Sequence, residues 1–133
     1  MSKPKPMRFN LSWARAGTTG NTDSPAWNDV QRELTETMRS SGTTQLTVIN
    51  APEIGADLLQ VFCESQRFVI MLGENTINDH EVRTPYDADR SPRNVSILGN
   101  EWDNRTVSDD ESFVLSVFLQ FFETFNVAHD LLS

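Results

Sequence analysis

The sequence predicts an α+β fold, with a twisted, mainly antiparallel sheet of about five to six strands and two main amphipathic helices packed on one face. Short segments rich in β-branched and aromatic residues recur along the chain, and two of them lie close enough to form a hairpin. Two longer segments place apolar residues at offsets of three and four, as amphipathic helices do. A chain of 133 residues has the length of one domain.

The N-terminal segment contains Pro4 and Pro6, which cannot donate hydrogen bonds in a sheet, so residues 1–7 are expected to form a flexible tail. The single domain is expected to span residues 8–133. Residues 8–15 alternate apolar and polar side chains, which indicates a half-buried strand. The glycine-rich stretch 16–23 is expected to be a loop.

The first helix is expected over residues 25–40. Ser24 is a suitable N-cap, Pro25 suits the first helical position, and Gly42 is expected to end the helix. The apolar residues of one helical face are Trp27, Val30, Leu34 and Met38.

The middle of the chain is expected to contribute most of the sheet. Residues 44–50 form one expected strand, and residues 58–65 and 66–73 form a hairpin. The polar stretch 74–93, which contains two prolines, is expected to be a long loop with a short edge strand at 81–84. Long loops in compact domains are often functional.

Two further strands are expected before the last helix. The first covers residues 94–100, and a short one at 103–107 follows it. Ser108 and Glu111 have the spacing of a capping box, which predicts that a helix of about fifteen residues starts here. Asp109 and Asp110 would then lie in its first turn. The apolar stripe of this helix is Val114, Val117, Phe118, Phe121, Phe122 and Phe125.

This last helix is too short and too polar to span a bilayer, so it is expected to be the main core helix. No other run of the sequence is apolar and long enough to cross a membrane, and its beginning lacks the apolar segment of a signal peptide. The only cysteine is Cys63, which excludes an intrachain disulfide and fits a reducing cytoplasm. A cytoplasmic location without membrane attachment is therefore expected.

The net charge of −8 limits the partners that the chain can bind. An acidic protein is repelled by phosphate backbones and by anionic lipid, so direct binding to nucleic acid is disfavoured. A basic partner is favoured. The acids concentrate in residues 101–133, which hold seven of them against a single arginine.

Catalytic and metal-binding motifs are lacking, so the protein is expected not to be an enzyme and to need no cofactor or metal. The sequence contains no GxSxG, CxxC, HExxH, EF-hand or P-loop pattern. His80 and His129 are expected to be exposed, and Cys63 is expected to be a buried, unreactive thiol. An enzyme that uses acidic residues and His80 stays open as a third class of function.

The three tryptophans fall into two groups. Trp13 and Trp27 are in phase with the apolar faces of their elements, so they are expected in the core. Trp102 lies in an expected polar turn, between Glu101 and Asp103. An exposed tryptophan among acids is a candidate hot spot for protein binding. The other interpretation is that Trp102 folds back over the edge of the core.

A resemblance to a known class of proteins rests on the segment VSILGNEWDNRTVSDDESFVLSVFLQFFETFNV, residues 95–127. It has a strand ending in glycine, a polar turn and an aspartate-led helix with paired aromatics. This segment resembles the small immunity proteins of bacterial polymorphic and contact-dependent toxin systems, especially the type-one immunity family. The likeness covers residues 9–127 in pattern and 95–125 in residue character. A glycine is expected near Phe125 in this pattern, and the chain has none there.

The resemblance implies an immunity protein that binds one cognate bacterial toxin domain in the cytoplasm and occludes its active site through an acidic surface. Charge complementarity would speed the encounter with a basic cleft. The hypothesis assigns partner binding to Trp102, Glu101, Asp103, Asp87 and Asp89. Either the long loop 74–93 or the acidic C-terminal third could make the contact. The alternative is a small non-catalytic adaptor or regulatory subunit that binds a basic protein, or that forms a homodimer through a sheet edge.

Overall fold

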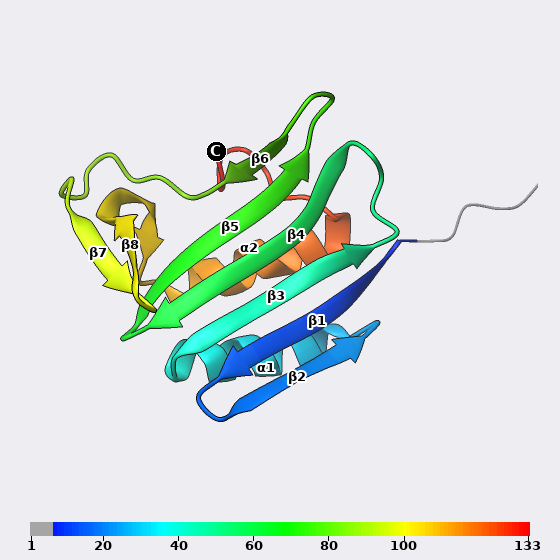
Figure 1. Ribbon diagram of the computed structural model, residues 1–133, viewed down its shortest axis with the longest axis horizontal. Helices are drawn as coiled ribbons and strands as arrows, with labels where there is room; N and C mark the ends of the chain where they lie inside the picture. The colour runs from blue at the N-terminus through cyan, green and yellow to red at the C-terminus, as the bar shows by residue number, and fades with distance from the viewer. Residues whose placement is uncertain (1–6) are drawn as a thin grey trace, which may run out of the picture.

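The computed structural model describes residues 7–133, and it has the predicted α+β architecture (Figure 1). An antiparallel sheet of seven strands has the order β2-β1-β3-β4-β5-β6, with the short β9 pairing with β5. The strands are β1 (Arg8–Arg15), β2 (Thr18–Asp23), β3 (Gly42–Ile49), β4 (Gly55–Glu64), β5 (Arg67–Asn75), β6 (His80–Arg83) and β9 (Val107–Ser108). The tail expected over residues 1–7 lies outside the described residues except for Met7, which is exposed.

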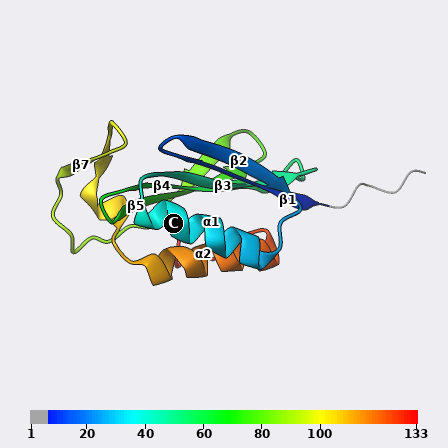
Figure 2. The ribbon, with the colours of Figure 1, turned by 90° about the horizontal axis from the view of Figure 1, so that it is seen from below.

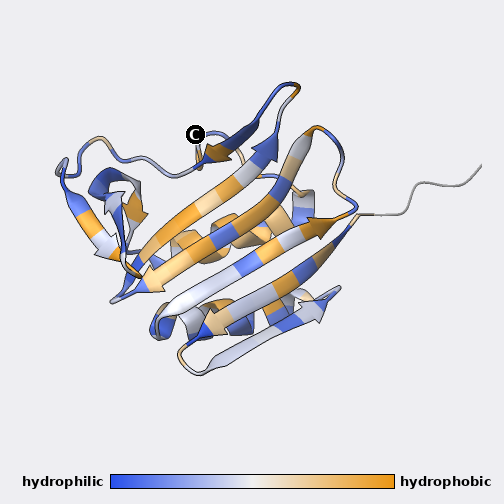
Figure 3. Cartoon of the chain, viewed as in Figure 1, coloured by the Kyte–Doolittle hydropathy of each residue, from blue (hydrophilic) through white to orange (hydrophobic). Residues whose placement is uncertain are grey.

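Two helices cover one face of this sheet, as Figure 2 shows. They are α1 (Trp27–Arg39) and α2 (Glu111–Thr124), and they contact each other as well as the sheet. Within the described part of the chain, neither helix has the length and apolarity needed to cross a membrane. Figure 3 shows the apolar residues of the central strands β4 and β5 and of α2 behind them in orange.

The main core lies between the sheet and the helices, where the alternating apolar residues of the strands meet the helical stripes. Phe9 of β1 stacks on Phe125 with ring centroids 4.6 Å apart, and also contacts Phe121 and Phe122 of α2. The large, fully buried side chains of this core are Leu11, Leu34, Met38, Leu46, Leu59, Phe68, Ile70, Leu72, Phe118, Phe121 and Leu132. Trp13 and Trp27 pack against it and are only partly buried.

A separate hairpin, β7 (Asn94–Ile97) and β8 (Asn100–Asp103), covers one end of the opposite face of the sheet. It forms a second, smaller core in which Val95 and Ile97 pack with Val69 and Val107. A 3₁₀ turn, η1 (Asn104–Thr106), then leads into β9. The single expected strand at 94–100 is therefore wrong, because the chain reverses at Leu98 and Gly99, both of which have positive φ.

Residues 16–23 are not the expected loop, because Thr18–Asp23 forms edge strand β2. The hairpin with β1 runs without a bulge from Arg15 opposite Thr18 to Asn10 opposite Asp23. The polar residues of β2 carry no apolar alternation, so pairing with β1 determines the conformation of this segment. Gly20 is needed there because a Cβ would lie 2.4 Å from the Trp13 ring.

The helix boundaries differ from the sequence expectation by a few residues. α1 begins after Ala26, whose backbone N–H donates to the Asp29 carboxylate at 2.9 Å, and Ser24 does not cap it. The helix ends at Arg39 with Ser40 as its C-cap, while Gly42 begins β3 at a place where a Cβ would lie 2.1 Å from the Ala14 carbonyl oxygen.

The caps of α2 also differ from the expectation. The N-cap is Asp110, whose carboxylate accepts hydrogen bonds from the backbone N–H groups of Ser112 and Phe113. The expected capping box on Ser108 is wrong, because the chain is still in β9 at that residue. At the other end Phe125 takes the left-handed conformation that glycine usually supplies, with φ 59°.

Candidate functional site

The end of the molecule that carries most of the predicted site residues is built from residues 84–111, called here the loop–hairpin surface. It comprises the loop after β6, the β7–β8 hairpin, η1 and the entry to α2. In Figure 1 it lies beside β5 and β6, at the opposite edge of the sheet from β2. This segment holds seven acids and three arginines.

Arg105 joins the loop to the hairpin. Its guanidinium makes a two-pronged contact with Asp103, at 2.7 and 3.0 Å, and lies over the Tyr86 ring at 5.6 Å. Its carbonyl accepts the backbone N–H of Asp87 at 2.8 Å. Hydrogen bonds from Arg105 lower the pKa of Asp103 to about 2, and the same contact raises the pKa of Arg105. Asp103 is thus engaged within the chain.

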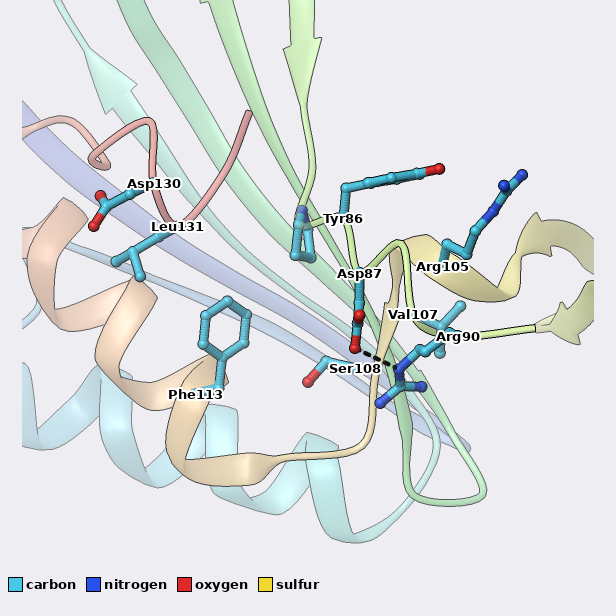
Figure 4. A pocket seen from close by; sticks show the side chains of 10 residues that line it. Tyr86, Asp87, Arg90, Arg105, Val107, Ser108, Phe113, Asp130 and Leu131 are labelled. Atoms are coloured by element: carbon cyan, nitrogen blue, oxygen red, sulfur yellow. Dashed lines mark ion pairs between the residues drawn. The ribbon is translucent and has the colours of Figure 1, made fainter. Parts of the chain in front are cut away.

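Arg90 organises the neighbouring acids in a similar way. Its guanidinium lies 3.7 Å from the Asp87 carboxylate, the ion pair drawn in Figure 4, and 3.2 Å from the Asp109 carboxylate. The Asp87 side chain also accepts the backbone N–H of Asp89 at 3.0 Å, which holds this part of the loop in a turn. Asp89 itself is exposed, and the described part of the chain shows no cation paired with it.

A cleft of about 240 Å³ opens between the loop, β9, the first turn of α2 and the C-terminal residues. Figure 4 shows side chains from these separate segments around it. Its apolar side chains are Pro85, Tyr86, Val107, Phe113 and Leu131. Its polar side chains are Asp87, Arg90, Arg105, Ser108 and Asp130. The lining of the cleft is therefore mixed, with as many polar as apolar residues.

Trp102 does not lie in a turn, because it is part of strand β8 opposite Val95. Its ring stacks on Phe62 of β4 with centroids 5.8 Å apart, so the side chain is half-buried and holds the hairpin on the sheet. Its indole N–H is buried and has no acceptor among the described residues. The neighbouring Glu101 is exposed and accepts a hydrogen bond from Asn94 at 3.3 Å.

The structure therefore brings some of the five predicted residues together and separates others. Asp87 and Asp103 meet around Arg105, and Asp89 adjoins Asp87. Glu101 and Trp102 lie on the hairpin, where Trp102 serves the second core. Sequence reasoning missed Phe113 and Leu131 as cleft residues, since nothing local in the sequence reveals which segments will meet. Arg90 and Arg105, which stand in a mainly acidic segment, were a signal in the sequence that ion pairs would organise this surface.

The residues considered for catalysis are dispersed. His80 Nε2 lies 3.4 Å from an Asp57 oxygen on the surface beside Gly73, and His129 is exposed. Cys63 is buried, and burial with the nearby charge of Glu111 raises its pKa to about 12, which suits the unreactive thiol expected from the sequence. Among residues 7–133 no three His, Cys, Asp or Glu side chains form a group that could hold a metal.

Comparison with solved structures finds a crystal structure of a hypothetical protein from Neisseria gonorrhoeae with the same fold. The TM-score is 0.78 over 96% of this chain and 95% of that one, at 14% sequence identity. No curated protein sequence matches the chain. The model of a family of unknown function, DUF6911, matches residues 11–131. Since this match covers nearly the whole domain, the chain belongs to the DUF6911 family.

Proposed function

We propose that this protein is an immunity protein, which binds a cognate bacterial toxin domain in the cytoplasm and occludes its active site with the loop–hairpin surface. The observation that carries the proposal is the cleft, lined by both apolar and charged side chains, within an acidic surface. Binding hot spots commonly combine an apolar pocket with a polar rim that excludes water. The resemblance of residues 95–127 to immunity proteins names the class of partner.

The charges of this surface favour a basic partner. Arg90 and Arg105 are each paired with aspartates of the same surface, so their positive charge is largely offset. Asp89 and Glu101 are exposed and have no ion pair within the described residues. A surface of this kind attracts a cationic cleft over several ångströms and speeds association, more strongly at low ionic strength.

We infer different roles in binding for the five predicted residues. Asp87, Asp89 and Glu101 have exposed carboxylates that a partner can reach. Asp103 is engaged with Arg105, and Trp102 with Phe62, so both support the shape of the surface. The cleft provides the anchor point, and the three exposed acids provide the charge.

The test is a pull-down of the tagged protein from its native host with a high-salt wash, followed by mass spectrometry. We expect recovery of the C-terminal domain of a large secreted protein. Affinity for that domain is then measured for the triple variant Asp87→Asn, Asp89→Asn and Glu101→Gln. We expect it to fall at least tenfold, as the loss of three charge contacts would give.

A matched control removes the same charge elsewhere, with Glu36→Gln, Glu53→Gln and Glu81→Gln, all exposed and outside residues 84–111. This variant should bind within about twofold of the unaltered protein. Equal losses in the two triple variants would refute the site. Recovery of housekeeping proteins alone would refute the toxin and favour the adaptor function.

A further inference from the structure

Strand β2 leaves one long edge of the sheet open. Figure 1 shows it as the outermost strand, with no element of the described chain beyond it. Its six residues, TTGNTD, contain no proline, no lysine or arginine and no bulge. Proline, charged side chains and bulges are the features by which proteins usually prevent an edge strand from pairing with another chain, and β2 has almost none of them. Its single charged residue, Asp23, lies 3.6 Å from Arg8 of the same molecule.

The pairing of β2 with β1 determines which backbone groups face outward. The backbone N–H of Ser24 donates to the Phe9 carbonyl at 2.9 Å, so the backbone groups of Ser24 point toward β1. Successive residues of an antiparallel strand alternate in this respect, so Thr18, Gly20 and Thr22 point their backbone groups toward β1. The N–H and C=O groups of Thr19, Asn21 and Asp23 consequently point away from the sheet.

The other edge of the sheet differs in each of these respects. Strand β6 has four residues, three of which are His80, Glu81 and Arg83. Ser133 lies beside the end of this strand, because its backbone N–H donates to the carbonyl of Thr84, the residue after β6, at 3.1 Å. The contrast between a short, charged edge and a long, nearly uncharged one identifies β2 as the edge suited to pairing.

We propose that β2 pairs antiparallel with β2 of a second copy of this chain, about a two-fold axis perpendicular to the sheet. The outward backbone groups of Thr19, Asn21 and Asp23 can then pair with those of the second copy if Asn21 lies opposite Asn21 of that copy. In this register Thr19 lies opposite Asp23 of the second copy, so a hydroxyl faces each carboxylate and no two acids are opposed. Each of these pairs exchanges its two backbone hydrogen bonds.

The surroundings of β2 leave room for this second copy. Helix α1 packs on β1, β3 and β4, so it lies back from the edge. On the helix side, Gly20 would stand opposite Thr22 of the second copy, a pairing of small side chains. The loop–hairpin surface lies at the far edge of the sheet, so both copies keep it accessible (Figure 1). The dimer therefore adds to the proposed function and does not depend on it.

Sedimentation velocity over a range of protein concentrations tests the association. We expect the mass to rise from 15.1 kDa toward twice that value. Asn21→Pro removes an outward N–H and no hydrogen bond to β1, so it should weaken dimerisation at least tenfold while circular dichroism stays unchanged. The control Asn21→Thr keeps the N–H and should still dimerise. A protein that stays monomeric throughout, or a dimer insensitive to Asn21→Pro, would overturn the proposal.

Disulfide trapping tests the register. Opposed residues of a hydrogen-bonded pair have α-carbons about 5.5 Å apart, which a disulfide can span. Asn21→Cys should therefore cross-link two copies under mild oxidation. Thr19→Cys should not, because four residues of offset place the two sulfurs roughly 13 Å apart. Cys63 is buried and does not compete. Equal cross-linking of both variants, or of neither, would contradict this pairing.

Discussion

At the scale of single residues, the buried Arg83 is the most heavily engaged charge in the described chain. Only 4% of it is exposed. Its guanidinium lies 2.9 Å from the Glu74 carboxylate and donates to the carbonyls of Leu132, at 3.1 Å, and Val127. One side chain thus fastens the C-terminal residues to β5 and β6, and these residues include a wall of the cleft.

We expect Arg83→Met to lower the free energy of unfolding by about 3–5 kcal/mol, because it leaves two buried carbonyls and the partly buried Glu74 carboxylate without their partner. Urea denaturation followed by circular dichroism measures the change. The exposed Arg93 supplies the control, and Arg93→Met should change the stability by less than about 0.5 kcal/mol. A loss below about 1 kcal/mol for Arg83→Met would mean that the C-terminal residues are held by other contacts.

At the scale of elements, the β7–β8 hairpin is attached to the sheet by few contacts. Its attachment consists of Val95 and Ile97 in the second core, the Trp102 stack on Phe62, and the Leu98 N–H bonded to Glu64 at 3.0 Å. Local opening of such a small unit requires less free energy than global unfolding. Trp102 therefore has a structural task that is separable from any contact with a partner.

We expect Trp102→Ala to destabilise the protein by about 2–3 kcal/mol, less than is usual for a fully buried aromatic side chain, because the ring is only partly buried. Limited proteolysis should then cut between residues 84 and 94 before the rest of the chain unfolds. Trp102→Phe, which keeps an aromatic ring on Phe62, should lose less than half as much. If Trp102→Ala left the stability unchanged, the structural role of Trp102 would be refuted, and binding to a partner would be its only remaining role.

Sequence reasoning located most elements because their local patterns agree with the tertiary structure. The alternation in β1 and the stripes of α1 and α2 all face the main core. Strand β2 was missed because its residues carry no pattern of their own, and pairing with β1 decides their conformation. The hairpin was missed because the positive φ angles of Leu98 and Gly99 turn the chain inside one apparent strand.

The site was less predictable than the fold. The exposed acids Asp87, Asp89 and Glu101 could be identified as charged surface residues from composition alone. The cleft could not, because Tyr86, Phe113 and Leu131 come from three segments far apart in the sequence, and the last of these is held in place by the hydrogen bond from Arg83 to the Leu132 carbonyl. The engagement of Asp103 with Arg105 depends on the η1 turn, in which the Asp103 side chain accepts the Arg105 N–H. Long-range contacts of this kind have no local signature.

At the scale of the whole molecule, Cys63 lies in the main core, where the sheet and the layer of two helices meet. It is fully buried, opposite Gly42 of β3 and Phe68 of β5, and the charge of Glu111 at the start of α2 acts on it. A thiol reagent can reach it only when these elements separate. Its pKa of about 12 also keeps the native thiol protonated at pH 8, whereas an unfolded cysteine has a pKa near 8.5.

We expect the reaction of Cys63 with an aromatic disulfide reagent at pH 8 to be at least about a thousandfold slower in the native protein than in urea-unfolded protein. This factor follows from the free energy of unfolding. Only opened molecules react, and a free energy of unfolding of roughly 5 kcal/mol or more leaves fewer than about one molecule in a thousand open. The urea dependence of the rate distinguishes the kinds of opening. If both layers must separate, its slope equals that of equilibrium unfolding, because the same surface is exposed. A slope near zero would instead show a local opening around β3–β5, and the two layers would then not unfold as one unit.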